Sequence, residues 1–281
     1  MSNRMDYMGP LKNILLATDG SEYSEGAIKE AIYLAKSCIE KLSVIYVLEV
    51  NPELETEGQK IVERMEIAAK EHLDRIRKMA AQDNVECEVI VRRTDQPYKA
   101  IVEEAGKIKS DVIVMGRRGR TGLKKILMGS VTAKVIGYSP CKVLVVPKDS
   151  EIKVDNIMVA TDGSKYCEAA EREAISMSKR CYPKVKKTFA ISVAPAGSDL
   201  PRAQANVGRV MEKAKEQGVE IEPLTIVGRR YEMILKAAKD RNADIIIMGT
   251  YGRTGIEKLL MGSVSERVVG LSQCPVLVVK A

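Results

Sequence analysis

The sequence predicts an α/β fold made of two tandem doubly wound domains, each built on a five-stranded parallel sheet. Short apolar runs alternate with amphipathic stretches along the 281 residues, as in strands joined by covering helices. The runs are continuously apolar, which indicates strands that are buried on both faces. The pattern also occurs twice, which predicts a first domain at 1–147, a second at 154–281 and a short polar linker, Lys148–Lys153, between them.

The repeat is clearest where each half begins. Asn13–Ala31 reads NILLATDGSEYSEGAIKEA, Asn156–Ala174 reads NIMVATDGSKYCEAAEREA, and the two agree at 12 of 19 positions. Each segment is an apolar strand that stops at Thr-Asp-Gly-Ser and passes into a helix. Asp19 and Asp162 therefore lie at the carboxyl ends of first strands, where open α/β sheets bind ligands. The alternative is that each Asp only caps the next helix, although the serine two positions later could do so instead.

The remaining elements follow in the same order in both halves. Further strands are expected at Leu42–Leu48, Glu86–Val91 and Val143–Val146, and at Thr188–Val193, Glu220–Val227 and Val276–Val279. Helices are expected at Thr56–Ala81 and Tyr98–Ile108, with Pro97 at the first helical position, and at Leu200–Gln217 and Tyr231–Arg241. Strands that alternate with helices in this way favour a parallel sheet covered on both faces.

The fourth strand of each half runs into a glycine-rich loop. The loops read GRRGRTGLKKILMGS from Gly116 and GTYGRTGIEKLLMGS from Gly249, and with one flanking residue on each side they agree at 12 of 17 positions. Each loop ends in Gly-Ser where a helix should begin, with Ser130 as the expected N-cap of the first. The start of a helix offers unpaired N–H groups to an anion, and arginines and lysines add positive charge. The two loops therefore predict phosphate binding.

Neither loop matches the common nucleotide motifs. They lack the GK[ST] ending of a P-loop, and their glycines follow the fourth strand without the GxGxxG spacing of a dinucleotide-binding loop. His72 is the only histidine and is expected on an exposed helix face, which excludes a histidine base in both halves. No Ser-His-Asp, Cys-His or paired-carboxylate arrangement lies near the loops. The sequence thus predicts a binding apparatus without an evident catalytic base.

Composition narrows the range of partners. The net charge of +7 permits nucleic-acid binding, but the basic residues are dispersed, and one Phe and no Trp leave few stacking platforms, so nucleic acid is not an expected partner. No apolar run approaches the ~18–20 residues of a membrane span, and the N-terminus lacks the apolar segment of a signal peptide. We expect a cytoplasmic protein. The six cysteines show no CxxC or metal-ligand spacing.

These motifs resemble those of the universal stress protein family over both halves of the chain. The resemblance is carried by ILLATDGS and IMVATDGS, by the pattern G-x2-G-x9-G-S in each repeat, and by the closing VLVV strands. It implies a nucleotide-binding, alpha-hydrolase-like domain with strand order 3-2-1-4-5, a bound adenine nucleotide and association of two such domains. Here the two domains are fused in tandem.

The family's binding residues can be carried over position by position. Those implied for the first domain are Ala17, Thr18, Asp19 and Val47 on the adenosine side, and Met115, Gly116, Arg118, Gly119, Gly129, Ser130 and Val131 on the phosphate side. Those implied for the second are Ala160, Thr161, Asp162 and Val193, and Met248, Gly249, Gly252, Gly262, Ser263 and Val264. Val193 is the weakest match because Pro195 follows it closely. Asp19 and Asp162 are also the candidates to hold a nucleotide-bound Mg²⁺.

The function expected from this resemblance is an ATP- or AMP-binding module of stress response or signalling. One alternative is a slow ATPase or phosphotransferase in which Asp19 or Asp162 holds the metal. The other is an interaction scaffold whose glycines serve packing alone. The last strands, Val143–Val146 and Val276–Val279, are apolar edges, which natural proteins cover. We therefore expect the two domains to pair through them, with a homodimer as a further assembly.

Overall fold

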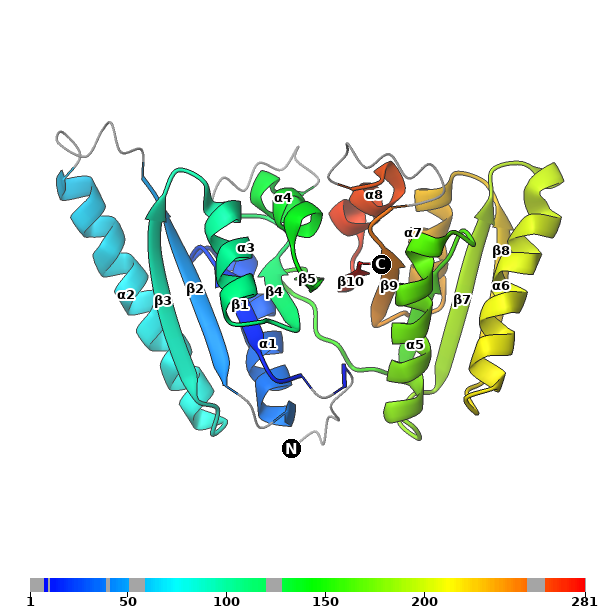
Figure 1. Cartoon of the computed structure of the whole chain (residues 1–281), viewed down its shortest axis with the longest axis horizontal. Helices are drawn as coiled ribbons and strands as arrows, with labels where there is room; N and C mark the ends of the chain where they lie inside the picture. Colours follow the sequence, from blue (N-terminus) through cyan, green and yellow to red (C-terminus); the bar gives the residue numbers. More distant parts are fainter. Residues whose placement is uncertain are drawn as a thin grey trace. The chain divides into compact units, whose positions relative to one another are not determined.

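The computed structural model describes residues 8–9, 11–38, 41–50, 59–119, 128–251 and 261–280, without the side chains of 37, 38, 59 and 61. It divides into two compact units, 10–149 and 150–281, and Met8 and Gly9 belong with the second unit. The boundary thus falls inside the stretch that the sequence indicates as a linker. Figure 1 shows the first unit, the first domain, from blue to green, and the second domain from green to red.

The first domain is a five-stranded parallel sheet in the order β3-β2-β1-β4-β5. Its strands are β1 (Ile14–Thr18), β2 (Leu42–Glu49), β3 (Cys87–Thr94), β4 (Val112–Gly116) and β5 (Lys142–Val146). Its helices are α1 (Glu25–Cys38), α2 (Gln59–Gln82), α3 (Pro97–Lys107) and α4 (Ser130–Tyr138), with a 3-10 turn, η1 (Glu22–Ser24), ahead of α1. Helices α1 and α2 cover one face of the sheet, and α3 and α4 lie together on the other (Figure 1).

The second domain repeats this arrangement in the order β8-β7-β6-β9-β10. Its strands are β6 (Asn156–Ala160), β7 (Lys187–Ala194), β8 (Glu222–Val227), β9 (Ile245–Gly249) and β10 (Val276–Val279). Its helices are α5 (Glu168–Arg180), α6 (Leu200–Lys215), α7 (Arg230–Asp240) and α8 (Ser263–Leu271), with 3-10 turns η3 (Lys165–Cys167) and η4 (Gly197–Asp199). Here α5 and α6 cover one face, and α7 and α8 cover the other.

The predicted fold class and the strand order 3-2-1-4-5 are confirmed in both domains. Every residue of the central strands β1, β4 and β9 is buried, which explains why these runs are continuously apolar. The outer strands β3 and β8 are partly exposed and carry polar residues. Strand ends differ from expectation by a few residues: β3, for example, continues to Thr94. The expected start of the long helix at Thr56 lies outside the described residues, and the pairing of the last strands stays a prediction.

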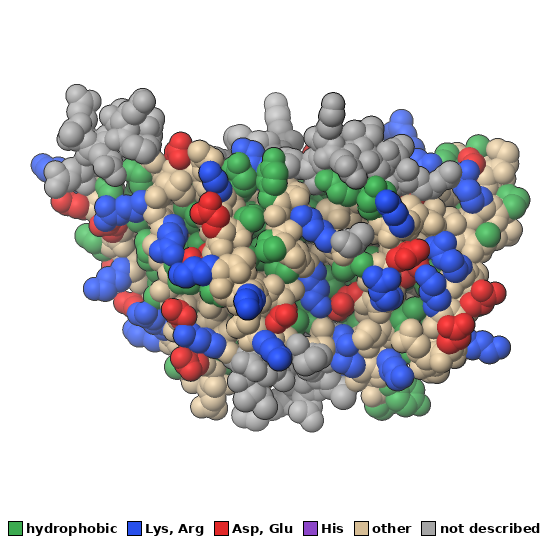
Figure 2. Space-filling view, in the orientation of Figure 1, with side chains coloured by type: hydrophobic (Ala, Val, Ile, Leu, Met, Phe, Trp, Pro, Cys, Tyr) green, Lys and Arg blue, Asp and Glu red, His purple; other side chains and the backbone are tan. Residues whose placement is uncertain are grey.

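Charged side chains are mixed over the surface of each domain. On the face shown in Figure 2, lysine and arginine side chains lie among aspartate and glutamate and do not gather into one basic stripe. Several pair across neighbouring elements, such as Lys36 with Asp83 and Lys187 with Glu222. No helix in the described part of the chain is long and apolar enough to cross a membrane.

Candidate functional site

In the first domain, β1 ends in a tight turn that fixes Asp19. Thr18 Oγ1 accepts a hydrogen bond from Gly20 N at 3.2 Å, and Gly20 has φ +79°, a conformation that glycine adopts without strain. Asp19 Oδ1 accepts bonds from Ser21 N at 3.0 Å and from Ser21 Oγ at 2.7 Å. Ser21 stands at the N-cap of η1, but its side chain makes no capping bond. The suggestion that the Ser21 hydroxyl caps the helix in place of Asp19 is therefore wrong, because this hydroxyl donates to Asp19. Asp19 itself lies two residues before the N-cap position and bonds to Ser21.

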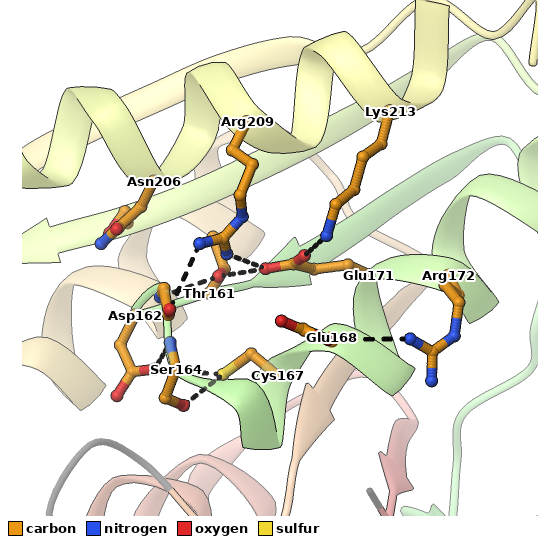
Figure 3. Close-up of polar contacts among 12 residues, drawn as sticks. Thr161, Asp162, Ser164, Cys167, Glu168, Glu171, Arg172, Asn206, Arg209 and Lys213 are labelled. Carbon is orange, nitrogen blue, oxygen red and sulfur yellow. Dashed lines mark hydrogen bonds and ion pairs between the residues drawn. The ribbon is translucent and has the colours of Figure 1, made fainter. Parts of the chain in front are cut away.

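In the second domain, β6 ends in the same turn. Gly163, again at φ +79°, donates from N to Thr161 Oγ1 at 3.1 Å, and Ser164 N donates to Asp162 Oδ1 at 3.0 Å. The second side-chain bond to the aspartate comes from a different residue, because the thiol of Cys167 donates to Asp162 Oδ1 at 3.3 Å (Figure 3). Burial, with the Asp162 charge as a lesser cause, raises the pKa of Cys167 to about 12. The thiol therefore stays protonated and remains a donor.

The groups that support the threonine of each turn are different. Thr18 Oγ1 lies 3.0 Å from both Ser24 Oγ and His72 Nε2. The expectation that His72 is exposed is wrong, because it lies on the face of α2 that covers β2 and contacts the ring of Tyr46. Burial, reinforced by the nearby Arg75 charge, lowers the pKa of His72, so the ring is neutral near pH 7. The first turn is thus supported by uncharged groups.

The second turn is supported by a buried ion cluster. Thr161 Oγ1 donates to Glu171 Oε1 at 2.7 Å, and the Glu171 side chain is 0% exposed. Arg209 and Lys213 reach from α6 to this carboxylate at 2.8 Å and 3.3 Å, as Figure 3 shows. Arg209 also donates to the carbonyl of Gly163 at 3.2 Å. Helix α6 is therefore tied to the strand-end turn through this arginine.

Glycines beside the turns have packing reasons of their own. A Cβ on Gly116 would lie 2.7 Å from the carbonyl oxygen of Tyr23, and one on Gly249 would lie 2.3 Å from that of Tyr166. Gly119 approaches the predicted ligand residue itself, since its Cβ would lie 2.8 Å from Asp19 Oδ2. These glycines let the loop reach the strand-end turn, so their presence alone does not require a ligand.

Both loops close in the same way onto the helix that follows. Gly129 N donates to Arg117 O at 3.0 Å, and Thr132 Oγ1 donates to Gly116 O at 3.1 Å. The N-cap is Gly129, whose φ of −63° and ψ of 144° are extended, so Ser130 is the first helical residue and its prediction as N-cap is wrong. The second loop repeats the closure, with Gly262 N to Thr250 O at 2.9 Å and Ser265 Oγ to Gly249 O at 3.0 Å.

A cavity of about 490 Å³ lies over the strand ends of the second domain. All the site residues predicted for this domain except Gly252 line it: Ala160, Thr161, Asp162, Val193, Met248, Gly249, Gly262, Ser263 and Val264. Gly252 lies outside the described residues. Val193 lines the cavity because β7 continues to Ala194, so that Pro195 follows the strand rather than interrupting it. The structure thus brings the predicted residues together, while their binding role stays a prediction.

Six further residues line this cavity that the predicted set does not include: Cys167, Ile191, Arg230, Ile234, Tyr251 and Ser265. Ile191 could have been predicted from Val193, because residues two apart on a strand such as β7 lie on the same face. Arg230 comes from the first turn of α7, and nothing local in the sequence places that turn beside the ends of β6 and β7.

The predicted residues of the first domain occupy equivalent positions. Ala17 and Met115 are buried near the ends of β1 and β4, Val47 lies near the end of β2, and Val131 is in the first turn of α4. The loop adds two half-buried, adjacent arginines, Arg117 and Arg118. Burial, followed by the charge of Arg118, lowers the pKa of Arg117. Residues 120–127 lie outside the described residues.

The described residues hold no cluster of three or more His, Cys, Asp and Glu side chains placed to bind a metal. The predicted site of each domain contains one carboxylate, Asp19 in the first domain and Asp162 in the second.

Comparison with known proteins gives a consistent result. The model of the universal stress protein family matches residues 10–147 and again 153–280. Universal stress protein MJ0531 of Methanocaldococcus jannaschii is 41% identical over 141 residues, which are 49% of this chain and 82% of that protein. Universal stress protein Slr1230 of Synechocystis is 25% identical over 95% of this chain and 99% of its own length. A crystal structure of a universal stress protein from Archaeoglobus fulgidus superposes with a TM-score of 0.76 at 26% identity, covering 95% of this chain and 98% of that one.

Proposed function

This chain belongs to the universal stress protein family, and we propose that each of its two domains binds one adenine nucleotide, so that the protein acts as a nucleotide-dependent module of stress response or signalling. The observation that carries the proposal is the cavity of the second domain. It gathers a strand-end aspartate, a glycine loop and the start of a helix around one space. This is the edge at which open α/β sheets bind ligands.

The size and lining of the cavity suit a nucleotide. Its volume of about 490 Å³ falls within the range of roughly 300–1,000 Å³ common for small-molecule sites. Aliphatic side chains, among them Ile191, Val193 and Ile234, offer an apolar surface for a flat base. The N-terminus of α8 at Ser263 presents backbone N–H groups, which suit phosphate oxygens.

The first domain supports the same ligand through its loop. Arg118 Nε is buried and has no hydrogen-bond partner among the described residues. A buried donor without an acceptor is costly, and a phosphate oxygen would satisfy it. Asp19, held by Ser21, is placed beside the loop at Gly119. Asp19 and Asp162 are the carboxylates that would face a magnesium ion carried by the nucleotide, since carboxylate oxygens are ligands of Mg²⁺.

Binding rather than catalysis is the role that these residues support. In the first domain, His72 contacts the strand-end turn through Thr18. In the second domain, Asn206 occupies the corresponding position and donates to Ser192 Oγ at 3.2 Å, so the two domains do not share a histidine base. We expect hydrolysis of bound ATP to be slow, because attack on phosphate needs a positioned water as well as charge neutralisation.

Titration calorimetry with ATP, ADP and AMP on the full chain tests the proposal. We expect two sites in the wild type, loss of the first in Gly129→Val and loss of the second in Gly262→Val. A Cβ on Gly129 would make only ordinary contacts, at 3.6 Å from Arg117 O and from Thr132 Oγ1, so the backbone there accepts a side chain, and thermal unfolding checks that the valine variant is folded. Gly208→Val, on α6 with open space around it, is the control. Absence of binding by the wild type with all three nucleotides would overturn the proposal.

A further inference from the structure

Arg230 lines the cavity of the second domain. Among the described residues that line it, Arg230 alone has a positively charged side chain, and Asp162 alone a negative one. Arg230 also lines a small polar recess next to the cavity, together with Asp162, Asp199 and Asn206. It is the first residue of α7 and is exposed, so its guanidinium is accessible from the mouth of the cavity.

The side chain of Arg230 makes no hydrogen bond or ion pair with any described residue, whereas the side chain of its neighbour Arg229 is paired. Arg229 donates to Glu232 Oε1 at 3.1 Å, and that carboxylate also accepts a bond from the hydroxyl of Tyr231 at 2.8 Å. The two adjacent arginines therefore have different surroundings. Arg229 belongs to a surface ion pair that does not line the cavity, whereas Arg230 lines the cavity and pairs with no carboxylate of a described residue.

The first turn of α7 is held beside the start of α8. The guanidinium of Arg267, in the second turn of α8, lies 4.7 Å from the ring centre of Tyr231. The first domain repeats this contact between α4 and α3, where the Lys134 ammonium lies 4.9 Å from the ring centre of Tyr98. Each tyrosine is the second residue of its helix, so the position of Arg230 is held by Pro97 in the first domain. The same scaffold thus carries a cation in one domain and an uncharged ring in the other.

The positions between the first two glycines of each loop show the opposite distribution of charge. The first loop has Arg117 and Arg118 between its first two glycines, and the second has Thr250 and Tyr251 at those positions. Thr250 is buried, and Tyr251 packs edge-on against Tyr166, with ring centres 5.9 Å apart. The second domain thus lacks a cation between the first two glycines of its loop and has one at the start of α7.

We propose that Arg230 binds the phosphate of the nucleotide in the second cavity and takes there the role that the loop arginines have in the first domain. The inference rests on the proposed nucleotide binding. It goes further by naming the ligand class: the second cavity prefers a phosphate-bearing nucleotide to the uncharged nucleoside. Arg230, at the start of α7, is the residue that sets this preference. A guanidinium is well suited to phosphate, because its N–H groups bond phosphate oxygens in pairs.

Methyl NMR of the full chain labelled with ¹³C-methionine separates the two sites. Met248 lines the second cavity and Met115 stands at the equivalent strand end of the first domain, so each reports on its own site. Met248→Leu and Met115→Leu assign the two signals. AMP and adenosine are titrated separately into wild type, Arg230→Gln and the matched control Arg229→Gln, and the dissociation constant is read at each methyl.

We expect Arg230→Gln to reduce the preference for AMP over adenosine at Met248 by about tenfold, the size of one hydrogen bond to a charged group. Adenosine affinity at Met248, both affinities at Met115 and all values in Arg229→Gln should stay within about twofold of wild type. An unchanged preference in Arg230→Gln would overturn the inference and leave nucleotide binding standing. An equal loss for AMP and adenosine would assign Arg230 to the base or ribose, which also overturns it. Failure of either compound to shift Met248 in the wild type would count against the proposed function itself.

Discussion

The two strand-end turns have the same backbone and different support. Both hold glycine at φ +79°, both close a bond from that glycine to a threonine hydroxyl, and both fix an aspartate through the next serine N–H. Behind the first threonine lie a serine and a neutral histidine. Behind the second lies a buried glutamate held by an arginine and a lysine.

The comparison shows which features each turn requires. The retained features are the backbone bonds that shape the turn and hold the aspartate. The exchanged features are the second side-chain donor to the aspartate and the groups that attach the turn to α2 or α6. His72 and Arg209 come from α2 and α6, the equivalent helices, and solve the same structural problem with different chemistry. The domains should therefore respond differently to removal of charge.

The largest expected effect is the loss of the buried carboxylate. Glu171→Ala removes the anion shared by Arg209 and Lys213, whose side chains are 35% and 36% exposed, and leaves the buried Thr161 hydroxyl without its acceptor, at a cost of about 3–4 kcal/mol. Urea unfolding of the full chain measures this. The matched change in the first domain is Glu25→Ala, which removes a partly exposed partner of Arg75 and should cost under about 1 kcal/mol. Equal losses for the two variants would contradict the contrast between the turns.

Next in size is the glycine that carries the loop past the turn. Gly249→Ala puts a Cβ 2.3 Å from the backbone oxygen of Tyr166, so the backbone must shift at a cost of about 3 kcal/mol. Gly129→Ala meets only ordinary contacts and should cost under about 1 kcal/mol. Thermal unfolding compares the two. If both alanine variants melted at the wild-type temperature, the packing reason given for Gly249 would be wrong.

A smaller effect should appear only at alkaline pH. The raised pKa of Cys167, about 12, means that an unfolded chain loses this proton first as pH rises. The thiol's contribution to stability is therefore complete below about pH 9 and is lost as pH rises toward 12. At pH 10.5 the loss amounts to about 2 kcal/mol. Cys167→Ser keeps a donor to Asp162 and does not titrate there. Unfolding at pH 7.5 and 10.5 should show a steeper fall for wild type, and parallel falls would refute the assignment.

The sequence was sufficient for the fold and for most of the residues around the cavity. Continuously apolar runs and an internal repeat predict two parallel sheets, and the family resemblance adds the strand order; the residues at strand ends then meet because all strands of each sheet are parallel. The support behind the turns was not predictable in this way, because Glu171 meets Arg209 only once α6 packs beside α5. A hint existed: Glu171 replaces Ile28 of the first repeat, and Arg209 and Lys213 are spaced to share a helix face.

The accuracy of the predicted helix starts varies: α6 begins at Leu200 as expected, whereas α7 begins at Arg230, one residue before the expected Tyr231. Ser130 has the side chain of a good N-cap, but the chain becomes extended at Gly129 because the loop closes through Gly129 N onto Arg117 O. The exposure of His72 was misjudged for a similar reason. Its neighbours on α2 are charged, and only the contact of the helix with β2 shows that this one polar residue faces inward.

The central claim, one adenine nucleotide in each domain, is tested most directly by native mass spectrometry of the full chain with added ATP. Bound nucleotides are counted per chain in wild type, Gly129→Val, Gly262→Val and the double variant. The account predicts two in the wild type, one in each single variant and none in the double variant. A wild-type chain that stays free of nucleotide at millimolar ATP, or a single substitution that removes both, would contradict it.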